Sequence, residues 1–165
     1  MKAEQIRELF NYHFAMNQKI WDQVISKLSD EQFLQEPGYP VRSVRSQLVH
    51  MIDIDRGWLG MIKGDRWRGT SNPANFPDRE SVRAYREETN ALLKEHLAQL
   101  EDETLLERSS RMRGAFEIWQ MYLHVITHSI DHRAQLMSIL NQMGVKTVEQ
   151  DLALHIFGGE WPSRG

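Results

Sequence analysis

Three histidines, His124, His128 and His132, fall four residues apart in one stretch of the chain. Residues at this spacing lie on neighbouring turns of one helix face, so two adjacent imidazoles of the set can reach a single metal ion. All three cannot share an ion, because the outer two lie about 12 Å apart along the helix axis. The spacing therefore predicts a chelating pair of histidines.

The helical wheel favours the pair His128 and His132. At about 100° per residue, the apolar face of this stretch centres near Tyr122 and Ile126. Each step of four residues drifts by about 40°, so His124 lies farthest from the apolar centre and His132 reaches its edge. The pair at 128 and 132 therefore points more toward a helical interior, where a third ligand from another helix could meet it.

His50 is the expected third ligand, because it lies at the edge of the apolar face of an earlier helical stretch. Three neutral imidazoles leave the remaining coordination positions to water or substrate, which is typical of a catalytic metal site. Imidazole suits zinc, nickel, copper and iron, so the sequence predicts a divalent metal ion, with zinc or nickel the first choice. The alternative is a plain helical domain whose histidines hold no metal, since isolated histidines are common in helices.

The pattern of apolar residues predicts the elements that position these side chains. Apolar residues recur at three- and four-residue spacing in four stretches, which favours four amphipathic helices. Ser43 and Asp78 are good N-cap residues, and Gly64 and Gly144 are stop signals. The expected helices cover about residues 3–28, 43–63, 78–100 and 115–143.

These helices predict an all-α fold, a four-helix bundle that forms a single domain over residues 1–165. The connection at 64–77, between the second and third helices, is rich in Gly, Asn and Pro and long enough to cross the bundle. Smaller features are expected between and after the helices. They are a capping box at Ser29–Gln32, a loop with Pro37, Gly38 and Pro40, a loop at 101–114 and a short helix at 148–157.

The composition excludes several classes of protein. The chain has 165 residues, of which 41% are hydrophobic, enough for the core of one domain. It has no cysteine, so disulfides and thiolate metal sites are excluded. The net charge of −3 gives no sign of a nucleic-acid partner, and no apolar run is long enough for a membrane span. Because the N-terminus lacks a signal-peptide pattern, we expect a cytoplasmic protein.

Several segments resemble the DinB family, also called DinB/YfiT-like metalloenzymes, and the resemblance covers nearly the whole chain. The segment His128–Gln135 resembles the family signature of two histidines four apart followed by Arg-Gly-Gln, with Ala134 here in place of the glycine. The alanine in place of glycine changes the local packing, but it does not change any of the expected metal ligands. Ser43–His50, followed by Trp58 and Leu59, resembles the second helix of the family. Tyr12, Asn17 and Leu28–Glu31 resemble its first helix and the end of that helix.

The resemblance implies metal ligands at His50, His128 and His132, in agreement with the wheel. Members of the family are four-helix bundles, often homodimeric, and some are thiol-dependent S-transferases or isomerases. The resemblance thus implies a metal-dependent enzyme, a thiol transferase or a hydrolase, that acts on a small molecule and uses a low-molecular-weight thiol. The alternative is a non-catalytic metal-binding protein of the stress response.

Asp55 lies near the middle of the apolar face of its helix, and a buried carboxylate needs a partner. It could be a general base beside the metal, or it could pair with His13 or Arg133. We favour the pair, and expect Arg133 as a partner across the core. His13 is expected to be a hydrogen-bonded core histidine.

The remaining polar and aromatic residues allow less specific expectations. His96 and His155 are expected at the surface or in the tail. Asp131 and Gln135 flank a histidine and could position a ring or face solvent. The tryptophans Trp58, Trp67 and Trp119 could line a pocket but are more often core residues. The charge runs at residues 86–88 and 111–113 are expected on solvated faces.

Overall fold

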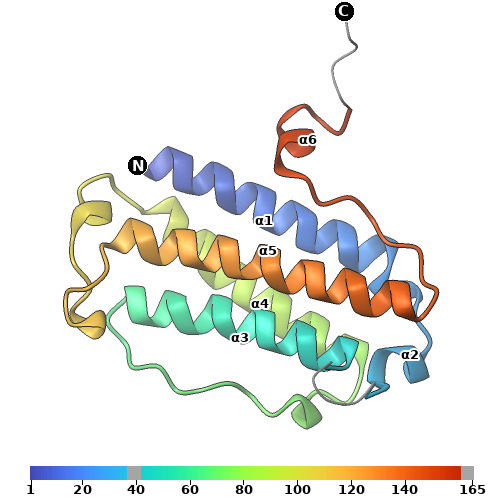
Figure 1. Ribbon diagram of the computed structural model, residues 1–165. Coiled ribbons are helices and arrows are strands. Elements are labelled where there is room, and N and C mark those ends of the chain that lie inside the picture. Colours follow the sequence, from blue (N-terminus) through green and yellow to red (C-terminus); the bar gives the residue numbers. More distant parts are fainter. Residues whose placement is uncertain (37–41, 161–165) are drawn as a thin grey trace, which may run out of the picture.

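A computed structural model describes residues 1–36 and 42–160, and within these ranges the fold is all-helical, without a strand. Four long helices form its body (Figure 1): α1 (Ala3–Gln23), α3 (Val44–Ile62), α4 (Arg79–Ala98) and α5 (Ile118–Gln142). Two short helices, α2 (Asp30–Leu34) and α6 (Leu152–Ile156), flank this body. The loop expected around Pro37, Gly38 and Pro40 lies outside the described residues.

Helices α3 and α4 run in the same direction, opposite to α1 and α5 (Figure 1). Two contacts between α3 and α4 follow the same order in both helices: Asp53 bonds to Tyr85, and one turn later Arg56 pairs with Glu88. Since consecutive parallel helices cannot be joined by a tight turn, residues 63–78 return along the length of the helices before α4 begins. This connection passes beside α3 and contributes to the site described below.

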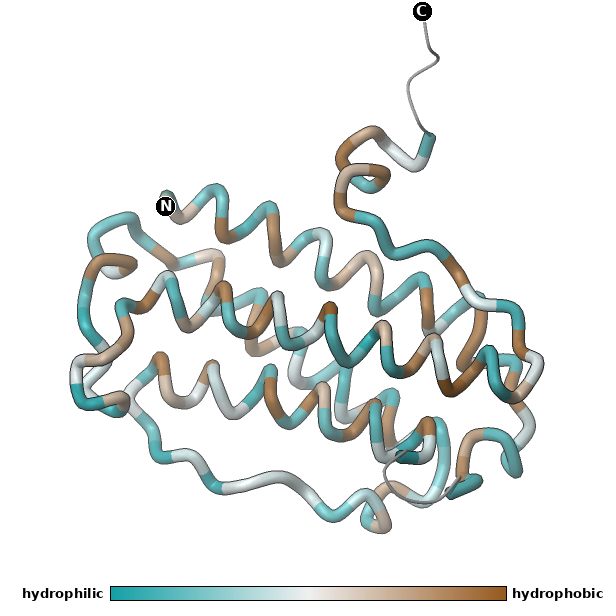
Figure 2. Tube along the Cα trace, in the orientation of Figure 1, coloured by the Kyte–Doolittle hydropathy of each residue, from teal (hydrophilic) through white to brown (hydrophobic). Residues whose placement is uncertain are grey.

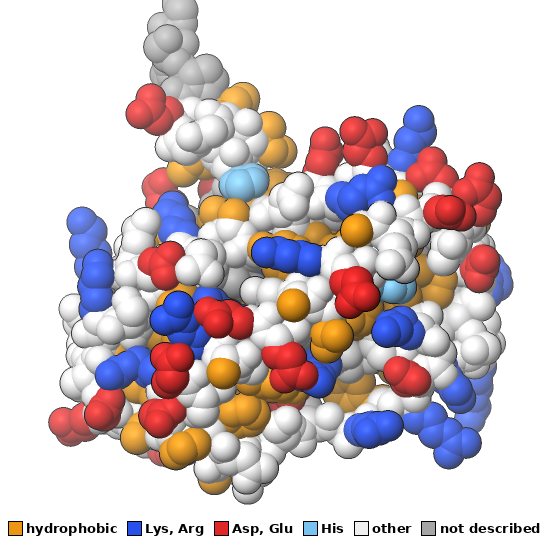
Figure 3. All heavy atoms as spheres, turned by 180° about the vertical axis from the view of Figure 1, so that it is seen from behind, with side chains coloured by type: hydrophobic (Ala, Val, Ile, Leu, Met, Phe, Trp, Pro, Cys, Tyr) orange, Lys and Arg blue, Asp and Glu red, His pale blue; other side chains and the backbone are white. Residues whose placement is uncertain are grey.

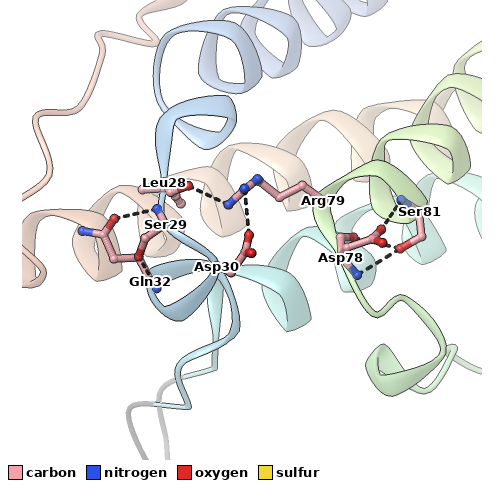
Figure 4. Close-up of polar contacts among 7 residues, drawn as sticks. All are labelled: Leu28, Ser29, Asp30, Gln32, Asp78, Arg79 and Ser81. Carbon is pink, nitrogen blue, oxygen red and sulfur yellow. Dashed lines mark hydrogen bonds and ion pairs between the residues drawn. The ribbon is translucent and has the colours of Figure 1, made fainter.

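The helix starts follow the capping signals in the sequence. Ser43 accepts a hydrogen bond from the backbone nitrogen of Ser46, and Asp78 accepts one from that of Ser81. Ser29 and Gln32 form the expected capping box at the start of α2 (Figure 4). At the other end of the chain, Gly144 has a φ of 72° after α5, in the left-handed conformation that glycine adopts without strain.

Arg79 joins the first turns of α2 and α4 (Figure 4). Its guanidinium donates to the carbonyl oxygen of Leu28 at 2.6 Å and pairs with the carboxylate of Asp30 at 2.8 Å. The Leu28 carbonyl lies just before α2, so the contact holds this short helix against the start of α4. Because Asp30 is exposed, the ion pair itself contributes little, roughly 0–1 kcal/mol.

Boundaries of three helices differ from the sequence expectation. The short helix expected at 148–157 covers only Leu152–Ile156. The first long helix ends at Gln23, and a 3₁₀ turn at Ile25–Lys27 takes the place of its expected last turn. α5 begins at Ile118, because the residues before it pair with an earlier segment. Ile118 donates to the carbonyl of Glu107, and Ser109 donates to that of Phe116, which keeps this stretch extended.

The core contains two apolar clusters with a layer of polar residues between them. Hydrophobic residues recur along each long helix (Figure 2). One cluster contains Ile20 and Leu136, and the other contains Phe10 and Ile126. The buried polar residues between these clusters come from all four long helices: His13, Asp55, Arg86, Thr89, Ser129 and Arg133. A polar layer of this kind stabilises the core only when its groups are bonded to one another.

Asp55 pairs with His13 and not with Arg133, which corrects part of our expectation. The Nε2 atom of His13 lies 2.9 Å from Oδ2 of Asp55, and His13 is fully buried. Arg133 is 0% exposed and donates instead to neutral oxygens. Its acceptors are Tyr12 Oη, Asn17 Oδ1, Ser129 Oγ and Gln150 Oε1. The expected pair of Asp55 with Arg133 was wrong. A helical wheel shows which face of a helix a side chain lies on, but not the level along the helix axis at which it meets a side chain of another helix.

Two residues expected at the surface are less exposed than expected: Arg86 is buried and His96 is half-buried. Arg86 is 6% exposed; its guanidinium lies 4.6 Å from the ring centre of Trp21 and donates to the carbonyl oxygen of Asn17. The aromatic face and the carbonyl replace part of the water that this cation loses on burial. His96 is half-buried and bonds to the hydroxyl of Tyr122 at 2.7 Å.

The outer surface carries charges of both signs. On the face opposite to that of Figure 1, acidic and basic side chains are interspersed with small apolar areas (Figure 3). None of the helices in the described ranges combines the length and the apolar character needed to cross a membrane.

Candidate metal centre

His50 on α3 and the pair His128 and His132 on α5 meet at one point. One ring nitrogen from each histidine lies within 4.8 Å of the other two. The ring centres of His128 and His132 are 4.2 Å apart, and that of His50 lies 4.5 Å from His132 and 5.2 Å from His128. Two ligands of one zinc ion lie at most about 4.2 Å apart, twice the bond length of about 2.1 Å. Small ring rotations would therefore bring the three nitrogens to a common ion.

The environment keeps these imidazoles neutral near pH 7. Partial burial is the largest cause that lowers the pKa of His50 to about 4, and the neighbouring His132 and Arg42 contribute to the same shift. Burial likewise lowers the pKa of His128 to about 4, with His132 as the second cause. Burial and Arg42 lower the pKa of His132. Neutral imidazoles have a free lone pair on one nitrogen, so the protonation state fits metal binding.

Gln47 fixes the orientation of one of these rings. Its side-chain nitrogen lies 2.7 Å from Nδ1 of His132 and 3.1 Å from the carbonyl oxygen of the same residue. The same nitrogen also donates to Oε1 of Gln135 at 3.2 Å. Gln47 is 1% exposed, so its amide is held firmly. Because the amide of Gln47 contacts Nδ1 of His132, Nε2 is the ring nitrogen directed away from Gln47, and it has a lone pair for a metal when the ring proton lies on Nδ1.

His124 does not belong to the cluster. Its ring centre lies 5.6 Å from that of His128 but 4.2 Å from that of Trp58, against which it is tilted by 40°. Trp58 also contacts Phe116, with ring centres 6.2 Å apart. His124 and Trp58 thus form an aromatic border on the side of the cluster nearer the start of α5, and the structure brings together the pair that the wheel favoured.

A polar pocket of about 290 Å³ opens beside His50. Its walls come from the start of α3, with Arg42 and Ser46, and from the connection between α3 and α4, with Thr70 and Ser71. The connection is held there by Asp53. The carboxylate of Asp53 accepts hydrogen bonds from the backbone nitrogen and the hydroxyl of Ser71, both at 2.7 Å. It also accepts one from the hydroxyl of Tyr85 at 2.8 Å.

Sequence reasoning missed three residues that shape this site, namely Gln47, Asp53 and Arg42. The first two are buried polar residues on α3. Their positions in the sequence, three residues before and after His50, place them on neighbouring turns, and this spacing was the available signal. Nothing in the sequence near Arg42 indicates that a loop some thirty residues later completes a pocket beside it.

An all-α fold with three histidines gathered between two helices defines a class of helical proteins able to hold one metal ion. The comparison with protein families is consistent with this class: the DinB family matches residues 1–161. The chain therefore belongs to the DinB family. A search of the curated proteins found no match.

Proposed function

We propose that this protein is a metal-dependent enzyme on a four-helix bundle, with His50, His128 and His132 as the ligands of one divalent ion. The observation that carries the proposal is the convergence of their three ring nitrogens within 4.8 Å of one another. Zinc or nickel is the proposed ion, because both accept a set of imidazole ligands. The long connection at residues 63–78 supports the site by forming one wall of the adjoining pocket.

The proposed reaction is thiol transfer or hydrolysis on a small molecule. A divalent ion with open positions lowers the pKa of a water or a thiol and makes it a nucleophile at neutral pH. The protein has no cysteine, so a thiol nucleophile would come from a low-molecular-weight cosubstrate. Three histidines leave room for it, whereas a structural site would be closed by a fourth protein ligand.

The residues around the cluster have separate tasks in this proposal. Gln47 holds the ring of His132, and the border of Trp58 and His124 limits the access of water from one side. The pocket beside His50 receives the small molecule. A cytoplasmic homodimer, with no nucleic-acid or membrane partner, remains a prediction, and sedimentation of the purified protein tests the dimer.

Turnover with and without a chelator tests the proposal. The untagged protein is loaded with zinc or nickel and screened with small thiols and electrophilic substrates. We expect turnover that is lost with chelator and restored by metal, absent in His128→Ala and retained in the control His155→Ala, which changes a histidine of α6 outside the cluster. Turnover that persists in chelator would contradict the role of the ion. Stoichiometric metal without turnover in the screen would instead favour a non-catalytic metal-binding protein.

A further inference from the structure

The pocket beside His50 has a polar wall with one cation that lacks an acceptor. Arg42 is exposed and lines this pocket. Within residues 1–36 and 42–160, no hydrogen-bond acceptor or carboxylate partner of its guanidinium is found. An arginine presents several donors in a planar fork that matches carboxylates and phosphates, which makes such a group a good anchor for an anion.

The two carboxylates that adjoin the pocket already have donors. Asp53 accepts hydrogen bonds from Ser71 and from Tyr85, which direct its charge toward the connection and α4. Glu36 accepts from the hydroxyl of Ser46 at 3.3 Å and does not line the pocket. The guanidinium of Arg42 is therefore left as the charged group available to a ligand in this space.

Arg42 lines the same pocket as His50, one of the three clustered histidines. The guanidinium and the ring of His50 therefore border one continuous space. A ligand bound between Arg42 and the cluster would thus span the pocket and reach the metal position. The volume of about 290 Å³ is close to the lower end of the range for sites that bind small molecules.

From this geometry we infer that the substrate or cosubstrate carries an anionic group, a carboxylate or phosphate, that Arg42 binds while the reactive end reaches the three histidines. Thr70 lines the same pocket, and a threonine hydroxyl can act as a second donor to an anion. This inference rests on the proposed metal site. It deepens that proposal by naming the chemical class of the ligand.

The test compares two thiols of equal length on the cobalt-substituted protein. The probes are 3-mercaptopropionate, which is anionic, and its neutral amide, 3-mercaptopropionamide. Thiolate binding changes the visible spectrum of cobalt, so a titration gives the dissociation constant of each probe without any turnover. We expect the wild type to bind the anion more tightly. In Arg42→Gln this preference should shrink by about fivefold, the effect of a partly solvated charge pair.

The matched control is Arg68→Gln, which removes the same charge from an exposed arginine that lines a different pocket. It should leave the preference for the anion unchanged. If cobalt binds and the wild type treats both probes alike, or if Arg42→Gln keeps the full preference, the inference is overturned while the metal site stands. If cobalt does not bind the wild type, the proposed function itself fails, and this inference fails with it.

Discussion

The side-chain amide of Gln47 lies 2.7 Å from Nδ1 of His132, across the interface between α3 and α5. The two residues are 85 positions apart in the chain, so the contact exists only because these helices pack against each other. With the amide nitrogen facing Nδ1, the neutral ring carries its proton on Nε2. Metal binding through Nε2 requires the proton on Nδ1, with the amide oxygen turned toward it and the bonds of the amide nitrogen to the His132 carbonyl and Gln135 given up. The helix that supplies His50 thus also orients His132.

Replacing Gln47 should weaken metal binding without removing a ligand. Gln47→Leu frees the ring of His132 to rotate, and we expect the affinity for zinc to fall about 10- to 100-fold, as for other residues that orient a ligand. In Gln47→Glu the carboxylate can accept from Nδ1, so the affinity should be largely retained. Competition with a chromophoric chelator measures both. Equal affinities in wild type and Gln47→Leu would show that the contact has no role in orientation.

The pair of Asp55 and His13 should be strongly coupled. Removing one partner leaves the other buried, and in similar cases this costs about 3–5 kcal/mol. A double-mutant cycle with Asp55→Asn and His13→Gln, followed by urea unfolding, should give a coupling of about 1–3 kcal/mol. The control cycle combines Asp55→Asn with Ser129→Ala, which removes a hydrogen bond of Arg133. The changes in the free energy of unfolding of these two variants should be nearly additive. Additive effects for Asp55 and His13 would refute the pair.

The metal-free protein should lose stability as the pH falls below 6.5. The pKa of His50 and of His128 is about 4 in the folded protein, against an ordinary value of 6.5. Between these values the unfolded chain takes up more protons than the folded one, so the free energy of unfolding decreases with decreasing pH.

Urea unfolding of metal-free protein at pH 7, 6 and 5 measures this loss. Other groups titrate in the same range, so the control is the double variant His50→Gln with His128→Gln. Its decrease in the free energy of unfolding from pH 7 to pH 5 should be smaller. An equal decrease in both proteins would show that these two histidines do not carry the effect.

Asp53 should hold the connection between α3 and α4 in place. Its carboxylate accepts two bonds from Ser71, so Asp53→Ala should free the connection while leaving the long helices folded. Hydrogen exchange should accelerate within residues 63–78 and stay slow in α5. Asp65→Ala, at an exposed aspartate of the same connection, is the matched control. Unchanged exchange in Asp53→Ala would mean that other contacts hold the segment.

Local signals predicted the helices well. Ser43 and Asp78 are the N-cap residues of α3 and α4, and Gly144 follows the end of α5, as the sequence predicted. Such signals can be recognised from sequence because they depend only on residues of the same helical turn. The sequence also predicted that His128 and His132 approach His50, because the helical wheel shows which side chains of each helix face the interior. The family resemblance selected the same residues.

Features that depend on packing between helices could not be read in this way. The burial of Arg86 requires the ring of Trp21 from another helix, and nothing near Arg86 in the sequence indicates it. The partner of Asp55 was ambiguous because His13 and Arg133 both lie on inner faces, and only the depth of each side chain decides between them. The pocket beside His50 depends on the path of a long connection, which periodicity does not specify.

The central claim is that imidazoles from α3 and α5 share one ion. An anomalous-scattering map at the zinc edge, from crystals of untagged protein grown with zinc, tests it most directly. We predict one strong peak within about 2.1 Å of a ring nitrogen of His50, His128 and His132, and its absence in His128→Ala. A map of the wild type without density between these three rings, or with its peak at other residues, would contradict the claim.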